Sequence, residues 1–187
     1  MVREEKNKLQ MKSLVFLLGL AALCAGCPAK PPSSPNAPIV SNPWDGNPDP
    51  SEPINGAYGF DIQPYPGTSM SAVTLWVRVN QNGNYSYSVS AKDNSTNTSI
   101  GTASSGSVSL VATGAYYSPV AFPFSGNLGV TKGDTIAFTV NLVSSPSGSS
   151  SAFCQGNTNA GNTTVTATSN GNPIPGTGVA VIVDGNS

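Results

Sequence analysis

From Ala57 onward, hydrophobic and polar residues alternate with a period of two, the pattern of a β-strand with one buried face. Two segments carry this pattern most regularly, residues 72–80 and 84–91. The residues that share one face are Val73, Leu75, Val77 and Val79 in the first segment, and Tyr85, Tyr87, Val89 and Ala91 in the second. The intervening Asn82-Gly83-Asn84 is typical of a tight hairpin turn. We therefore expect these segments to form an antiparallel hairpin.

Further short strands are expected along the rest of the chain. Their ranges are 57–62, 99–103, 107–112, 117–124, 136–142, 152–155 and 163–168, and the apolar run 178–183 indicates a central strand. Beyond residue 26 no segment shows a helical, 3.6-residue hydrophobic repeat. Eight to ten short strands separated by turn residues predict an all-β domain, a single antiparallel β-sandwich with a jelly-roll or immunoglobulin-like Greek-key topology.

The N-terminus has the pattern of an export signal. Lys12 precedes an apolar run over 13–23, which is too short for a membrane-spanning helix. The following Cys24-Ala25-Gly26-Cys27 resembles the lipobox of bacterial lipoproteins, with Cys24 where leucine is usual. The resemblance implies that residues 1–26 are removed and that Cys27 is acylated, for example with palmitate, and anchors the protein to a lipid membrane. In a bacterium with two membranes, Pro28 after this cysteine favours the outer membrane of the cell envelope.

Two alternatives remain open for this terminus. Cleavage by a simple secretory signal near Gly26 or Ala29 would instead give a secreted protein. Met11 is also a plausible true start, because Met11-Lys12 supplies a compact basic region on its own.

Proline dominates the next part of the chain. Residues 28–66 contain 11 of the 16 prolines, and such a segment favours an extended, hydrated spacer. We expect residues 27–55 to be a lipidated cysteine followed by a tether, and residues 56–187 to be the folded domain.

Charge and composition narrow the function. Charged residues make up 9% of the chain, the net charge is −1, and there is no histidine. This excludes histidine-based nucleophilic catalysis and disfavours nucleic acid as a partner. The acidic residues 61, 93, 134 and 184 are expected mostly in or beside turns, so we expect a binding or assembly protein and not an enzyme. Cys154 would be the one cysteine left in the folded domain, as a small buried residue or, alternatively, a reactive or intermolecular thiol.

One candidate metal site lies in the proline-rich segment. Asp45, Asn47 and Asp49 have the alternate spacing of oxygen ligands in a calcium loop, and Glu52 follows them. Pro50 stands where such a loop needs glycine. The alternative is that these are ordinary tether residues, and no other cofactor is expected.

The other candidate is a sugar site. Trp76 and Arg78 lie on the face opposite Val77, and Tyr117 is similarly out of phase with its apolar neighbours. If exposed, Trp76 would stack on a sugar ring while Arg78 binds hydroxyls. The alternative is that a loop, or the segment from Trp44 to Tyr65, covers Trp76.

A second resemblance concerns one predicted hairpin, and it is followed by a third possible function. Residues 129–140, a Gly-Asp turn leading into an alternating strand, resemble hairpins of secreted jelly-roll and carbohydrate-binding-module sandwiches. The last possibility is a structural subunit that pairs with a protein partner through an edge strand.

Overall fold

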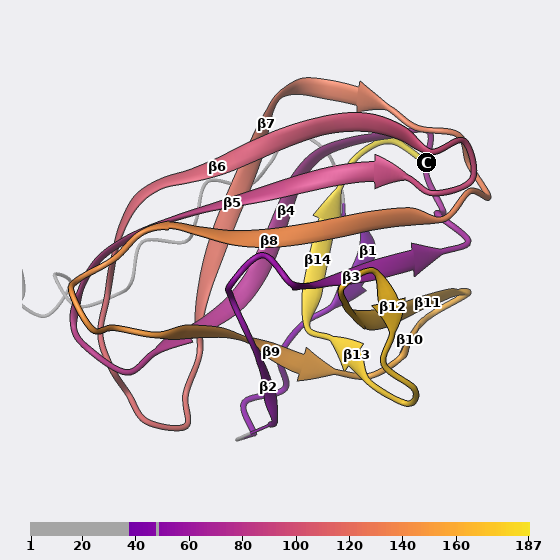
Figure 1. Cartoon of the computed structure of the whole chain (residues 1–187). Helices are drawn as coiled ribbons and strands as arrows, with labels where there is room; N and C mark the ends of the chain where they lie inside the picture. Colours follow the sequence, from indigo (N-terminus) through magenta and orange to yellow (C-terminus); the bar gives the residue numbers. More distant parts are fainter. Residues whose placement is uncertain (1–37, 48) are drawn as a thin grey trace, which may run out of the picture. The chain divides into compact units, whose positions relative to one another are not determined.

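Two antiparallel β-sheets packed face to face make up the domain (Figure 1). The computed structural model describes residues 38–47 and 49–187, which belong to one compact unit. The predicted all-β sandwich is confirmed. Within the described residues, no helix has the length and apolar character needed to cross a membrane. The predicted signal peptide, Met11, Cys24, Cys27 and the first part of the predicted tether lie outside the described residues.

One sheet, here called the β4 sheet, is built around its longest central strand. Its members are β1 (Pro38–Asn42), β2 (Ser51–Pro53), β4 (Ser69–Val79), β7 (Ser118–Gly129), β9 (Ser151–Gly156), β13 (Gly178–Val179) and β14 (Val181–Asp184). β7 pairs along one edge of β4, and β14 and β9 share the other edge. The predicted central strand at the end of the chain is confirmed for β14, which lies between β1 and β4.

The second sheet, here called the β8 sheet, has the order β10-β11-β3-β8-β5-β6 with β12 beside β11. Its members are β3 (Tyr58–Gln63), β5 (Gly83–Asp93), β6 (Thr98–Leu110), β8 (Ile136–Ser144), β10 (Asn159–Ala160), β11 (Thr163–Ser169) and β12 (Asn172–Pro173). The two strands expected within 99–112 are one continuous strand, β6, in which a bulge near Gly106 absorbs the change of register.

The predicted hairpin of 72–80 and 84–91 is wrong, although both strands exist. β4 and β5 belong to different sheets, and the short connection after Val79 carries the chain across the sandwich. The inward residues of both strands are nevertheless buried, because the two strands face the same core from opposite sides. A period of two identifies the buried face of a strand but cannot identify the sheet to which that strand belongs.

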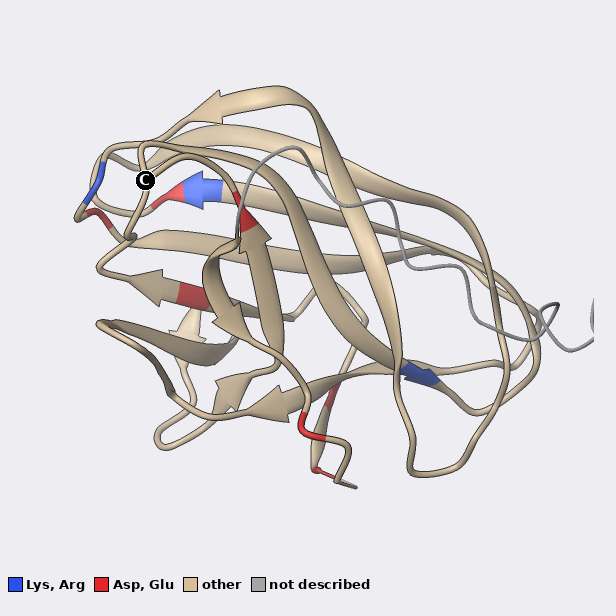
Figure 2. Cartoon of the chain, turned by 180° about the vertical axis from the view of Figure 1, so that it is seen from behind, with Lys and Arg blue, Asp and Glu red and all other residues tan. Residues whose placement is uncertain are grey.

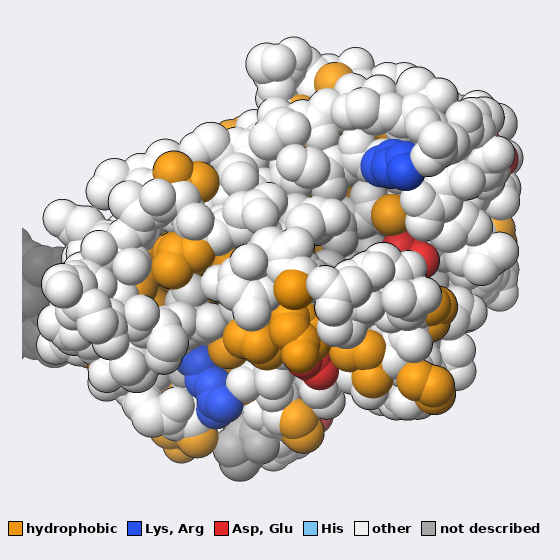
Figure 3. All heavy atoms as spheres, viewed as in Figure 1, with side chains coloured by type: hydrophobic (Ala, Val, Ile, Leu, Met, Phe, Trp, Pro, Cys, Tyr) orange, Lys and Arg blue, Asp and Glu red, His pale blue; other side chains and the backbone are white. Residues whose placement is uncertain are grey.

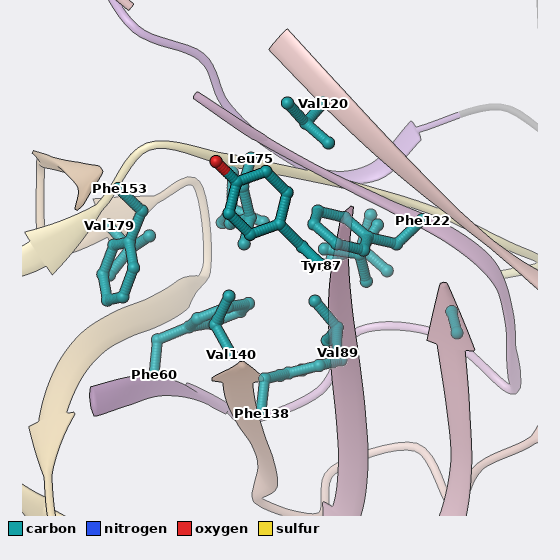
Figure 4. Packing of buried hydrophobic residues seen from close by; sticks show 14 of the residues in the cluster. Phe60, Leu75, Tyr87, Val89, Val120, Phe122, Phe138, Val140, Phe153 and Val179 are labelled. Carbon is teal, nitrogen blue, oxygen red and sulfur yellow. The ribbon is translucent and has the colours of Figure 1, made fainter. Parts of the chain in front are cut away.

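Aromatic and β-branched side chains from both sheets fill the space between them (Figure 4). Phe60 of β3 and Phe138 of β8 are register partners, and their rings stack with centroids 4.7 Å apart and planes 10° apart. Phe122 and Leu75 from the β4 sheet are also fully buried. With one free, buried cysteine among the described residues and no disulfide there, this core supplies the stability of the fold.

The predicted start of the domain at residue 56 is too late. β1 pairs with β14, and β2 pairs with β9, so both belong to the β4 sheet. Val40 and Asn42 alternate inward from β1, and Asn42 Nδ2 donates to the carbonyls of Asn157 (2.8 Å) and Val179 (2.7 Å). The prolines mislead because Pro38 and Pro53 occupy strand ends at the edges of the sheet, where a missing N–H is tolerated.

The surface of the domain is sparsely charged. Long stretches of the strands in Figure 2 carry no charged residue, and residues 94–131 contain none. On the face seen in Figure 3, neutral polar side chains and backbone predominate, and hydrophobic side chains gather in a few patches. Contacts made by this surface therefore depend mainly on neutral hydrogen-bonding groups and on local aromatic clusters.

Candidate functional site

The outer face of the β4 sheet has a junction at Trp76. β4 pairs with β14 as far as Leu75 and with β9 from Val77 onward. The small residues Ala180 and Cys154 are buried beside this junction, and the Ala180 amide donates to the Cys154 carbonyl at 3.1 Å. Trp76 packs against these two residues as part of a second, smaller hydrophobic cluster and is half-buried.

A segment from the N-terminal side covers this cluster. We call residues 43–47, 49 and 50 the Trp44 segment. Tyr117 is 6% exposed, and its hydroxyl donates to the carbonyl of Asp49 at 2.7 Å. The Trp44 ring meets the Tyr117 ring edge-on, with centroids 5.3 Å apart. Trp76 and Trp44 both pack against the cluster of Tyr117, Cys154 and Ala180, so Trp76 is partly buried, and the expected exposure of Tyr117 is wrong.

The exposed aromatic side chain of this region is Tyr116, which the sequence did not single out. Tyr116 is 61% exposed, and its ring lies edge-on to Trp44 with centroids 6.2 Å apart. Trp44 itself is half-buried, and its indole nitrogen donates to the carbonyl of Asn47. Tyr116 and Tyr117 are consecutive residues in the loop before β7, and the first is exposed while the second is buried.

Arg78 lies beside this cluster, as predicted from its phase in β4. Its Nη2 donates to Ser51 Oγ at 2.6 Å, and its Cζ lies 5.4 Å from the centroid of the Tyr117 ring. The second contact is a cation–π interaction, which stabilises a partly desolvated guanidinium. Arg78 therefore connects β2, β4 and the loop before β7.

The predicted calcium ligands do not converge. Both carboxylate oxygens of Asp45 accept hydrogen bonds from Asn47, from its amide N–H at 2.9 Å and from Nδ2 at 2.8 Å, and these bonds lower the pKa of Asp45. Glu52 accepts a hydrogen bond from Gln155 Nε2 at 2.7 Å. Across residues 38–47 and 49–187, no three acidic, cysteine or histidine side chains lie together as a metal site would need. The alternate spacing here builds a turn, with Asp45 as its capping residue.

A cleft of about 190 Å³ opens beside the Trp44 segment. It is lined by Pro43, Trp44, Asp45, Asp49, Pro50, Gln155, Gly156 and Asn157. Partial burial raises the pKa of Asp49, and the nearby charge of Asp45 raises it further. One tryptophan, two acidic residues and two residues with amide side chains thus line one small cavity.

Cys154 is buried under the same cluster, which confirms the expectation of a small buried residue. Burial raises the pKa of the Cys154 thiol to about 12, and the negative charge of Asp49 adds to the effect. Arg78 opposes the shift only weakly. The thiol therefore stays protonated and unreactive at neutral pH.

Two of the remaining acidic residues lie close together: desolvation raises the pKa of Asp134, and the negative charge of the neighbouring Asp93 raises it further. Asp93 Oδ1 accepts the amide N–H groups of Ser95 (2.8 Å) and Thr96 (3.1 Å), so it caps a turn as expected. Asp61 and Asp184 instead lie within β3 and β14. Burial raises the pKa of both carboxyl groups.

Comparison with known proteins adds no relative to this description. No protein-family model matches the chain, and no curated protein is significantly similar to it.

Proposed function

We propose that this protein is a lipid-anchored protein of the bacterial cell envelope whose β-sandwich binds carbohydrate without catalysis. The cleft beside the Trp44 segment is the proposed site. The observation that carries the proposal is that Trp44, Asp45, Asp49, Gln155 and Asn157 together line a cavity of about 190 Å³.

This combination has the chemistry that a sugar ring requires. A pyranose presents an apolar C–H face, which packs on an indole ring, and a rim of hydroxyls, which donate to carboxylates and exchange hydrogen bonds with amides. A small number of fixed polar groups around an apolar wall is the usual form of a ligand site. The proposed sugar site therefore lies at Trp44, which lines the cleft, and not at the partly buried Trp76.

The anchor rests on the lipobox resemblance of Cys27. Since β1 begins at Pro38, the spacer between the anchor and the domain reduces to residues 28–37, which include four prolines. Mass spectrometry of the mature protein tests this part of the proposal. We expect a diacylated or triacylated Cys27 at the N-terminus in the outer-membrane fraction, and an unmodified terminus at Ala29 or later would contradict it.

The binding activity is tested with a glycan array followed by calorimetry on the glycans retained. Trp44→Ala should abolish binding, and Asp49→Asn should weaken it. Val143→Ser is the matched control, because Val143 is 63% exposed on β8, in the other sheet. An array without any bound glycan, or binding that survives Trp44→Ala, would reject the proposal.

A second candidate function is assembly through β6, the edge strand of the β8 sheet. β6 spans 13 residues without proline or charge, whereas β7, at the edge of the other sheet, carries Pro119 and Pro123. Proline cannot donate to an added strand, so β7 has a protection against edge pairing that β6 lacks. Concentration-dependent oligomers that disappear on Thr102→Pro would support assembly, and a monomer at all concentrations would reject it.

A further inference from the structure

Among the residues that the structure describes, the positive charge of Arg78 is not neutralised by an ion pair. It is half-buried on the outer face of the β4 sheet, and its contacts are a hydrogen bond to Ser51 Oγ and the face of Tyr117. No carboxylate in the described part of the chain forms an ion pair with it. A guanidinium has five N–H donors, and the Ser51 bond uses one of them. Since partial burial of an uncompensated charge is costly, an anion that reaches this group is bound favourably.

A pocket of about 450 Å³ gives access to Arg78. Its lining includes the polar residues Ser51, Asn80 and Ser150 and, among the residues that the structure describes, no acidic residue. The Ser150 amide donates to Asn80 Oδ1 at 2.6 Å, which fixes the side chain of Asn80 and leaves its Nδ2 as a donor. The pocket therefore combines one cation with neutral hydrogen-bonding groups, a composition suited to an anionic group.

The Arg78 pocket adjoins the Trp44 cleft. Pro50 lines the cleft and the next residue, Ser51, lines the pocket. Tyr117 connects the two as well, because its hydroxyl binds the carbonyl of Asp49 while its ring lies beneath Arg78. Because the two linings meet at Pro50 and Ser51, we take the cleft and the pocket as neighbouring subsites for one chain-like ligand.

We infer that the ligand is an acidic saccharide, in which one sugar occupies the Trp44 cleft and the carboxylate of an adjacent sugar acid binds Arg78. A carboxylate matches the planar fork of a guanidinium, which can donate two parallel hydrogen bonds to it. The cleft, which is lined by Asp45 and Asp49, then accepts the neutral sugar, and the pocket, which contains Arg78, accepts the sugar acid. The order of the two units along the ligand is thereby fixed. This inference rests on the proposed carbohydrate binding and names its substrate class.

The test compares saccharides that differ only at the carboxyl group. Calorimetry is run with a uronate-containing oligosaccharide, with the same oligosaccharide after carboxyl reduction, and with a neutral oligosaccharide. The full mature chain should bind the acidic form about 10 to 100 times more tightly than the reduced form, the range expected for a charged hydrogen-bonded pair. Arg78→Gln should remove this preference, and Arg78→Lys should retain part of it. Lys92→Gln, which changes an exposed cation on the other sheet, is the control and should change neither affinity.

The outcomes separate the two proposals. Equal binding of the acidic and reduced forms, sensitive to Trp44→Ala, overturns the sugar-acid assignment and leaves the carbohydrate site. No binding of any saccharide overturns both. Binding of a peptide by its free C-terminal carboxylate, lost on amidation of that terminus, also overturns the sugar-acid assignment. Circular dichroism melts of each Arg78 variant show whether a loss reflects binding or folding, and the lysine variant retains the charge if the glutamine variant unfolds.

Discussion

The rings of Tyr85 and Tyr87 lie nearly parallel inside the sandwich, with centroids 6.0 Å apart and planes 3° apart. Both side chains are fully buried, but their hydroxyl groups differ. The Tyr85 hydroxyl donates to the carbonyl of Gln81 at 2.7 Å. The Tyr87 hydroxyl has no hydrogen-bond partner in the described part of the chain. The two residues are therefore an internal pair for measuring what a buried hydroxyl contributes.

Removal of the two hydroxyls should have unequal effects on stability. Tyr85→Phe breaks a hydrogen bond and leaves the Gln81 carbonyl without its donor, so the free energy of unfolding should fall by about 1 kcal/mol. Tyr87→Phe removes an unsatisfied polar atom and should leave the stability unchanged or raise it. Urea unfolding of both variants measures the difference, and an equal loss in the two would contradict the assignment.

Alkaline pH should destabilise the domain. Burial raises the pKa of Tyr87 to about 12, and it also raises the pKa of Tyr65. The unfolded chain ionises its tyrosines near pH 10 while the folded chain keeps these two protonated. The free energy of unfolding is therefore not reduced by these two tyrosines below about pH 10, and it falls as the pH rises towards 12. Thermal melts between pH 8 and 12 measure this loss, which should be shallower in Tyr87→Phe.

Asp61 should destabilise the fold at neutral pH. Desolvation raises the pKa of this half-buried carboxyl, so the folded state binds the proton more tightly than the unfolded state does. The contribution of Asp61 to the free energy of unfolding is therefore most favourable below about pH 4, the pKa of this group in the unfolded chain. The contribution is lost as the pH rises through the higher pKa of the group in the folded protein. Asp61→Asn should raise the melting temperature at pH 7 and have little effect at pH 3. A lower melting temperature at pH 7 would show a stabilising partner for the charge.

The N-terminal strand should be necessary for stability. Asn42→Ala removes two donors and leaves the carbonyls of Asn157 and Val179 unpaired, at an expected cost of about 1 to 3 kcal/mol. Ser41→Ala is the matched control, because Ser41 is exposed on the same strand. Chemical denaturation that fails to distinguish the two variants would indicate that residues 38–42 are a spacer after all.

Alternation of hydrophobic residues predicts the buried face of the main strands, although it misses core residues such as Val40 and Ile54. Val73, Leu75, Tyr85, Tyr87 and Phe138 are all buried, because a strand with one side in the core must alternate. The partners of each strand were not predictable from it. The β4–β5 connection looks like a hairpin in sequence, yet pairing depends on strands far apart along the chain, such as β3 with β11.

The candidate site was only partly accessible to sequence reasoning. The phase of Trp76, Arg78 and Tyr117 places all three on the outer face, as expected, but exposure depends on what covers that face. The cover comes from Trp44, in a stretch whose prolines and acidic residues resemble a spacer. Such contacts between distant residues leave no periodic signal, whereas the buried Asn42 illustrates that polar residues in such a stretch can be structural.

The pairing of β1 with β14 gives the domain adjacent ends. Pro38 lies opposite Asp184 in this pair, so the first and last strands of the domain run side by side (Figure 1). A fold closed in this way tolerates circular permutation, because a short linker can join the old ends while new ends are opened in an exposed loop such as that around Gly148. The same property makes the sandwich a portable module, which a host protein could carry as an insertion within a surface loop as readily as at its terminus.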